Sequence, residues 1–180
     1  MSTFDEALER NMVLFVGSYL KEQERALVKI GKLLDKQIDA LVLLDESDMS
    51  ARVGLPVNHK AIVIDCDFSN DTALQKALAP YKHRLLAVTC RAERNIPLLK
   101  KAIPHVPYLN TPTERSLDWT TDKIKMRQML RGYDKSISPK FVVAHDASKE
   151  TINQIERKVG FPLIIKPSGL AASLLVTLCY

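Results

Sequence analysis

The chain has 180 residues, of which 46% are hydrophobic and 26% are charged, with a formal net charge of +5. This composition excludes a disordered chain and allows one complete domain together with part of a second. The basic residues are mixed with 21 acidic ones, so the charge indicates a solvated surface rather than a nucleic-acid interface.

The cysteines and the N-terminal residues bear on where the protein works. Cys66, Cys90 and Cys179 are far apart, which is neither a disulfide framework nor a zinc spacing. The first six residues are polar and acidic, unlike a secretory signal, and no apolar run approaches the ~20 residues of a membrane span. We therefore expect a cytoplasmic protein with no membrane partner.

Short apolar runs alternate with amphipathic stretches in the first two thirds of the chain. Continuous apolar strands separated by helices are typical of a parallel sheet covered on both faces. We therefore predict an α/β fold, with a doubly wound lead domain over residues 1–110. The predicted strands are 12–16, 40–44, 61–64 and 85–88. The first predicted helix contains Leu27, Ile30 and Leu34. The second contains Leu74 and Leu78 and follows a cap at 69–71, and the third is residues 96–102.

A doubly wound sheet binds ligands beyond the carboxyl ends of its strands. Gly17 follows the first predicted strand, but no G-x-G-x-x-G motif is present there. This weakens the interpretation of the lead domain as a dinucleotide-binding dehydrogenase domain.

A proline-rich segment at 104–112 marks the end of this domain, and a different pattern of elements follows over residues 111–180. Short strands interspersed with helices predict an α+β unit there. Its predicted elements are a helix at 122–131 with a cap at Thr120 or Thr121 and a stop at Gly132, a strand at 141–144, a helix containing Ile152, Ile155 and Val159 with a cap near Ser148 and a stop at Gly160, a strand at 162–167, a small-residue loop at 168–173 and a strand at 174–179.

Two lysines are the candidate binding residues of this second unit. Lys166 ends an apolar strand and precedes a loop of small residues whose backbone N–H groups can approach phosphate oxygens. The same pattern also suits a lysine that only closes a strand. Lys123, Arg127 and Arg131 form a basic stripe on one helix, and on spacing alone a solvated face is the better interpretation of that stripe.

The order of these features resembles the opening of the ATP-grasp fold. Asp122-Lys123 opens a helix, and Gly-Phe-Pro-Leu-Ile-Ile-Lys-Pro at 160–167 precedes a small-residue loop, as in many members of that superfamily. The preceding α/β unit is similar to the lead domain, the pre-ATP-grasp domain, of these enzymes. The resemblance covers essentially the whole chain and is specific from Asp122 to Ser173.

The resemblance implies roles for particular residues. Lys166 and Lys123 would contact the phosphates of ATP, and Ile164 would line the adenine side. Ser168, Gly169 and Ser173 would belong to the loop that covers the phosphates. The resemblance also implies ATP and Mg²⁺ as cofactors. Its members, which include carboxylate–amine ligases and carbamoyl-phosphate-synthase-like enzymes, phosphorylate a carboxylate, and an amine or a similar nucleophile then attacks the acylphosphate.

In that family the acidic Mg²⁺ ligands and the second lobe of the clamp would follow Tyr180. We therefore expect residues 111–180 to be the first, truncated part of an ATP-grasp domain, with no catalytic residue and no metal ligand of its own. We expect this chain alone to be inactive and to bind ATP weakly or not at all. The expected partners are ATP and a small-molecule substrate of the full-length protein, without nucleic acid. The final strand is expected to have an exposed edge, which leaves a homo-oligomer open.

The main alternative is a non-catalytic α/β module that binds a small ligand or a partner protein. Such a module would use the ends of its strands.

Overall fold

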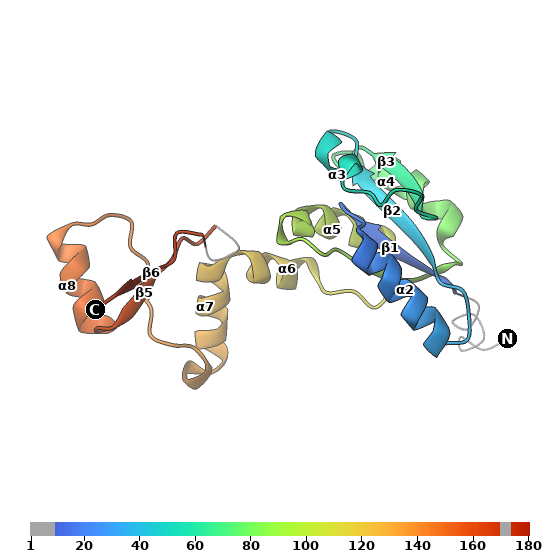
Figure 1. Ribbon diagram of the computed structural model, residues 1–180. Helices are drawn as coiled ribbons and strands as arrows, with labels where there is room; N and C mark the ends of the chain where they lie inside the picture. Colours follow the sequence, from blue (N-terminus) through green and yellow to red (C-terminus); the bar gives the residue numbers. More distant parts are fainter. Residues whose placement is uncertain (1–9, 170–173) are drawn as a thin grey trace. The chain divides into compact units, whose positions relative to one another are not determined.

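The computed structural model describes residues 10–169 and 174–180 (Figure 1). The chain forms two compact units, Met1–Glu114 and Arg115–Tyr180. The proline-rich segment at 104–112, which predicts a boundary, lies near the end of the first unit.

A parallel sheet of four strands forms the centre of the first unit, which confirms the prediction of an α/β fold. The strands lie in the order β3-β2-β1-β4, so that β1 and β2 are the two central ones. All four predicted strands form, with β3 shifted toward its C-terminal end relative to the prediction. Their bounds are Met12–Val16 for β1, Asp39–Asp45 for β2, Ile62–Cys66 for β3 and Leu85–Thr89 for β4.

Helices flank the sheet because each parallel connection must cross over one face. One face is covered by Leu27 of α2 and Ala51 of α3, which pack in a cluster with Phe15 and Val42. The short helix α3 was not predicted. The helices are α2 (Lys21–Leu33), α3 (Met49–Val53), α4 (Asp71–Leu78) and α5 (Ile96–Ala102), with 3-10 turns η1 (Ala79–Tyr81), η2 (Glu93–Asn95) and η3 (Ile103–His105).

The amino ends of three strands are joined through Arg84, the residue before β4. Its backbone carbonyl accepts from the N–H groups of Asn11 and Met12, at 3.0 and 2.9 Å. Its guanidinium donates to the Asn11 side chain at 3.2 Å and to the carboxylate of Asp39, the first residue of β2. One arginine therefore fixes where β1, β2 and β4 begin relative to one another.

At the opposite end of β1, Gly17 lies in tight contact with the buried side chain of Asn95. Gly17 has a φ of +79°, and a Cβ at this position would lie 2.5 Å from the Asn95 side-chain carbon Cγ. Asn95 in turn donates to the Ser18 hydroxyl at 3.2 Å. Both the backbone conformation and the space therefore require glycine at position 17.

We expect Gly17→Ala to lower the free energy of unfolding of the first unit by more than about 1 kcal/mol, because a left-handed backbone alone has a cost of that order. The loss should be smaller when Gly17→Ala is made in an Asn95→Ala background, where part of the clash is absent. Urea denaturation of the four chains measures this coupling. Equal losses in the two backgrounds would contradict the close contact.

The second unit contains three helices, a 3-10 turn and a two-stranded antiparallel sheet among its described residues. Ile164 of β5 pairs with Leu178 of β6. The elements are α6 (Glu114–Thr121, whose first residue belongs to the first unit), α7 (Lys123–Tyr133), η4 (Lys135–Ile137), α8 (Lys149–Lys158), β5 (Leu163–Ile165) and β6 (Thr177–Cys179).

Several predictions for this unit are wrong. The strand predicted at 162–167 is only Leu163–Ile165 and ends before Lys166. Residues 141–144 form no strand, and in the described part of the chain no strand pairs with them. The final strand is shorter than 174–179, because Leu175 has a φ of +56°, which is incompatible with extended backbone. The helix predicted to stop at Gly132 continues to Tyr133. Helix α6 was not predicted.

The predicted start and stop of α8 are confirmed. The Ser148 hydroxyl accepts from the Thr151 N–H at 3.2 Å, and Gly160 ends the helix region with a φ of +83°. Asp146 supports this cap: its carboxylate accepts from the Thr151 hydroxyl at 2.6 Å and from the Ser148 N–H at 3.0 Å. These hydrogen bonds, the one from Thr151 first, lower the pKa of Asp146 to about 2.

A carboxyl group whose pKa is lower in the folded than in the unfolded state stabilises the fold at pH values above its unfolded-state pKa. This stabilisation is lost as the pH falls through the folded-state pKa. We expect the contribution of Asp146 to be complete above pH 3.8 and to disappear as the pH falls through about 2. Asp146→Asn should therefore lower the unfolding midpoint of α8, followed by its amide NMR signals, at pH 5 and not at pH ~2. Glu156→Gln, on the same helix, is the control. A difference between wild type and Asp146→Asn that is unchanged at low pH would refute this role.

Candidate functional site

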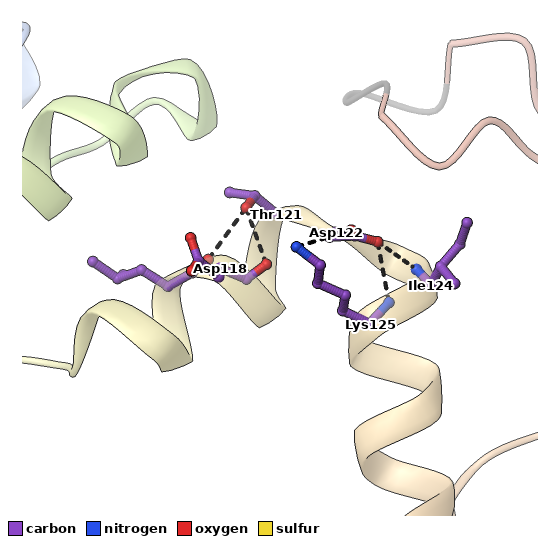
Figure 2. Close-up of polar contacts among 6 residues, drawn as sticks. Asp118, Thr121, Asp122, Ile124 and Lys125 are labelled. Carbon is purple, nitrogen blue, oxygen red and sulfur yellow. Dashed lines mark hydrogen bonds and ion pairs between the residues drawn. The ribbon is translucent and has the colours of Figure 1, made fainter.

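The site begins at the break between α6 and α7 (Figure 2). The hydroxyls of Thr120 and Thr121 donate back to the Leu117 carbonyl, at 2.8 and 3.2 Å. The prediction that one of these threonines caps α7 is therefore wrong, because both side chains are used at the end of α6. Asp122 is the cap instead, and its carboxylate accepts from the N–H groups of Ile124 and Lys125, at 2.9 and 3.1 Å.

The Asp122 carboxylate stays ionised in this position. The Lys125 N–H, followed by the Ile124 N–H and the Lys125 side chain, lowers the pKa of Asp122. An ionised carboxylate at a helix N-terminus is favoured by the helix dipole. The cap places Lys123 at the first residue of α7, on the first turn of a helix whose start is fixed.

A cavity of about 570 Å³ lies within the second unit, and it is of the size typical of small-molecule sites. Four segments enclose it: α7, residues 140–144, α8, and β5 with the turn after it. Five of the six site residues predicted from sequence line this cavity, and the sixth, Ser173, lies outside the described residues. The five are Lys123, Ile164, Lys166, Ser168 and Gly169.

The helix and the loop after β5 are in direct contact inside this cavity. The Lys123 ammonium lies 3.4 Å from the backbone carbonyl oxygen of Ser168. Lys166 is two residues before that carbonyl, so the two lysines approach the same loop from α7 and from β5. Positions 43 residues apart in the sequence thus meet in one site.

Two further cations line the cavity that the sequence did not single out as ligands. Arg127 lies one helical turn after Lys123 and is half-buried, whereas Arg131, one turn further, is exposed and lies outside the lining. The interpretation of the basic stripe as a solvated face fits Arg131 and is incomplete for Lys123 and Arg127, which are half-buried and line the cavity. Lys140 is the other cation. The one feature of the sequence that points to it is its position directly before the apolar run 141–144.

The rest of the lining is mainly apolar. Helices α7 and α8 bury none of their residues completely, so their inner faces form cavity wall rather than closed core. Ile164 and Ile165 keep 60% and 52% of their surface exposed. The apolar lining residues are Ile124, Met126, Phe141, Val142, Val143, Ala144, Ile155, Val159, Leu163, Ile164, Ile165 and Pro167.

The described residues that line this cavity are not the ligands that Mg²⁺ prefers. Magnesium binds proteins through carboxylate oxygens, and none of the described lining residues is Asp or Glu. Across the described part of the chain, no three His, Cys, Asp or Glu residues come together as a metal site would require. The site as described is cationic and apolar, a combination that suits an anionic ligand with an apolar part.

Comparisons with known proteins do not extend this description. No protein-family model matches the chain, and no curated protein sequence matches it either. Within the described residues, no helix is both long and apolar enough to cross a membrane.

We expect Asp122→Ala to loosen the first turn of α7, because two N–H groups lose their acceptor. Hydrogen exchange followed by NMR should show faster exchange at the amides of Ile124 and Lys125. Asp122→Asn keeps an oxygen acceptor and should preserve slow exchange at both amides. Unchanged exchange in Asp122→Ala would show that the cap does not hold Lys123 in place.

Proposed function

We propose that this chain supplies the nucleotide-binding part of an ATP-dependent ligase with an ATP-grasp clamp, which activates a carboxylate for attack by an amine or a similar nucleophile. The observation that carries the proposal is that Lys123, on a helix, and Lys166, directly after strand β5, line one cavity with a largely apolar wall. The lead domain with a parallel sheet, followed by a unit with these two lysines, supports the more specific ATP-grasp assignment.

The lining matches the two chemical parts of ATP. The ammonium groups of Lys123 and Lys166 supply positive charge for the phosphates, and the backbone of Ser168 and Gly169 lies beside them. Ile164 belongs to the apolar wall, against which a flat nucleobase can bury its faces. The residues thus fit a nucleoside triphosphate with its phosphates toward the lysines.

In the proposed reaction, the carboxylate oxygen attacks the γ-phosphorus and the bond to ADP breaks. The nucleophile then attacks the acyl carbon, and inorganic phosphate leaves. The part assigned to this chain is to hold and orient the phosphates and to compensate their charge, which lowers the barrier of phosphoryl transfer. We assign no proton transfer or covalent step to the described lining residues.

The open wall predicts weak binding by this chain. Ligand sites of high affinity bury 70–90% or more of a ligand. Ile164 and Ile165 remain more than half exposed, so this cavity covers a nucleotide on one side only. We therefore expect a dissociation constant for Mg-ATP well above the micromolar range, which calorimetry measures.

A second candidate function is a non-catalytic module that binds a partner protein. The exposed apolar side chains of the β5–β6 region favour it, since contiguous apolar surface marks many interaction sites. Leu174, Leu175 and Leu178 are exposed by 59%, 70% and 51%. This candidate predicts no specific response of Lys166 to nucleotide.

We expect Lys166→Met to weaken ATP binding about tenfold, because a charge-assisted contact to phosphate contributes about 1.5–3 kcal/mol. Amide NMR titration, which tolerates weak affinity, should locate the shifts at the turn after β5 and at the start of α7. Lys158→Met is the matched control: Lys158 ends α8, is exposed, and lies outside the lining.

Equal affinities of the two lysine variants would sink the nucleotide assignment. Shifts scattered over both units without saturation would do the same, and they would leave the partner-binding module as the better interpretation.

A further inference from the structure

The cavity is lined by more positive charge than two phosphate-binding lysines supply. Four cationic side chains line it, those of Lys123, Arg127, Lys140 and Lys166. No acidic side chain accompanies them among the described lining residues. In the chain as a whole, 26 basic residues are mixed with 21 acidic ones, so a lining with four basic residues and no acidic one among its described members is a local feature.

The four cations come from three separate segments. Lys123 and Arg127 lie on consecutive turns of α7 and are half-buried, whereas Lys140 and Lys166 are exposed and lie before residues 141–144 and after β5. An extended anion with several charged groups can contact more than one of these segments at once.

Two carboxylates close in sequence to the lining, those of Asp122 and Asp146, already accept hydrogen bonds at helix starts. Asp122 accepts from two N–H groups at the start of α7 and lies 3.7 Å from the Lys125 ammonium. Asp146 accepts from Ser148 and Thr151 at the start of α8. Both would have to give up a helix cap to become metal ligands.

We propose that this cavity binds a polyphosphate chain in its metal-free form, with Arg127 and Lys140 taking the charge that Mg²⁺ compensates at other nucleotide sites. The inference rests on the proposed function in placing a nucleoside triphosphate here. The preference for metal-free phosphate follows from the four cations alone.

The physical reason is competition between cations for the same oxygens. Mg²⁺ on a triphosphate removes two of its negative charges and brings bound water with it. It also adds a dipositive ion to a space already bordered by four positive groups, which repel it. Mg²⁺ should therefore weaken binding at this site.

The test measures dissociation constants by amide NMR titration of the full chain with ATP and with inorganic tripolyphosphate, each in EDTA and in excess Mg²⁺. We expect Mg²⁺ to weaken the binding of both ligands about threefold or more, because each bound Mg²⁺ cancels two negative charges of the ligand. Adenosine alone should shift apolar lining residues such as Ile164.

The outcomes separate this inference from the proposed function. Tighter binding of ATP with Mg²⁺ than with EDTA overturns the metal-free preference and leaves nucleotide binding standing. Equal binding of tripolyphosphate and ATP with no response to adenosine overturns the nucleotide assignment and leaves the metal-free site standing. If neither anion binds, both are overturned.

A pair of double variants with equal net charge tests the two added cations. Arg127→Gln with Lys140→Gln should weaken tripolyphosphate binding in EDTA about tenfold and abolish the effect of Mg²⁺. Arg131→Gln with Lys135→Gln removes the same charge from exposed positions outside the lining and should change neither. Equal behaviour of the two double variants would show that only overall charge matters, and would overturn the role of Arg127 and Lys140.

Discussion

The fold of the first unit depends on the complete burial of its two central strands. Every residue of β1 is buried, as are the five central residues of β2. Backbone groups in such strands have no access to water and must be paired within the sheet. Parallel pairing on both sides of β1 meets this need, and it in turn requires crossover helices that cover both faces. The order of helices and strands follows from that requirement.

The second unit differs from the first, because many of its apolar side chains are exposed. Among its described residues few are buried, and Leu163 is the buried member of β5. The apolar inner faces of α7 and α8 border a space instead of a closed core. A ligand that binds only the folded form of a protein shifts its folding equilibrium. Any ligand of this space would therefore stabilise the fold of the second unit.

The sequence predicts strands and helices well where one face or the whole element is buried. It predicts them poorly where pairing with another segment decides whether the element forms. The apolar runs of β1 and β2 specify strands on their own, because only a covered sheet can bury them. The run 141–144 has the same appearance but lines a cavity, since a short apolar run forms a strand only if another strand pairs with it. Asp122 was recognised as a helix start but not as the cap. The resemblance predicts that Lys123 and Lys166 share one site. For Arg127 and Lys140 the sequence offers only a place in a basic stripe and a place before an apolar run, and neither pattern predicts that they line the same cavity.

The contacts of Arg84 have a consequence for how the first unit can vary. They join the amino ends of β1, β2 and β4, so a slip of one strand past another would break several hydrogen bonds at once. The register of these three strands is thus fixed at their amino ends, independently of the loops at their carboxyl ends. The loops that follow Val16 and Thr89 are held by the contact between Gly17 and Asn95. The loop that follows Asp45 lacks that contact, and insertions or deletions there can change its length and shape while the strands keep their alignment. The carboxyl end of β2 is, for this reason, a part of the sheet free to diversify.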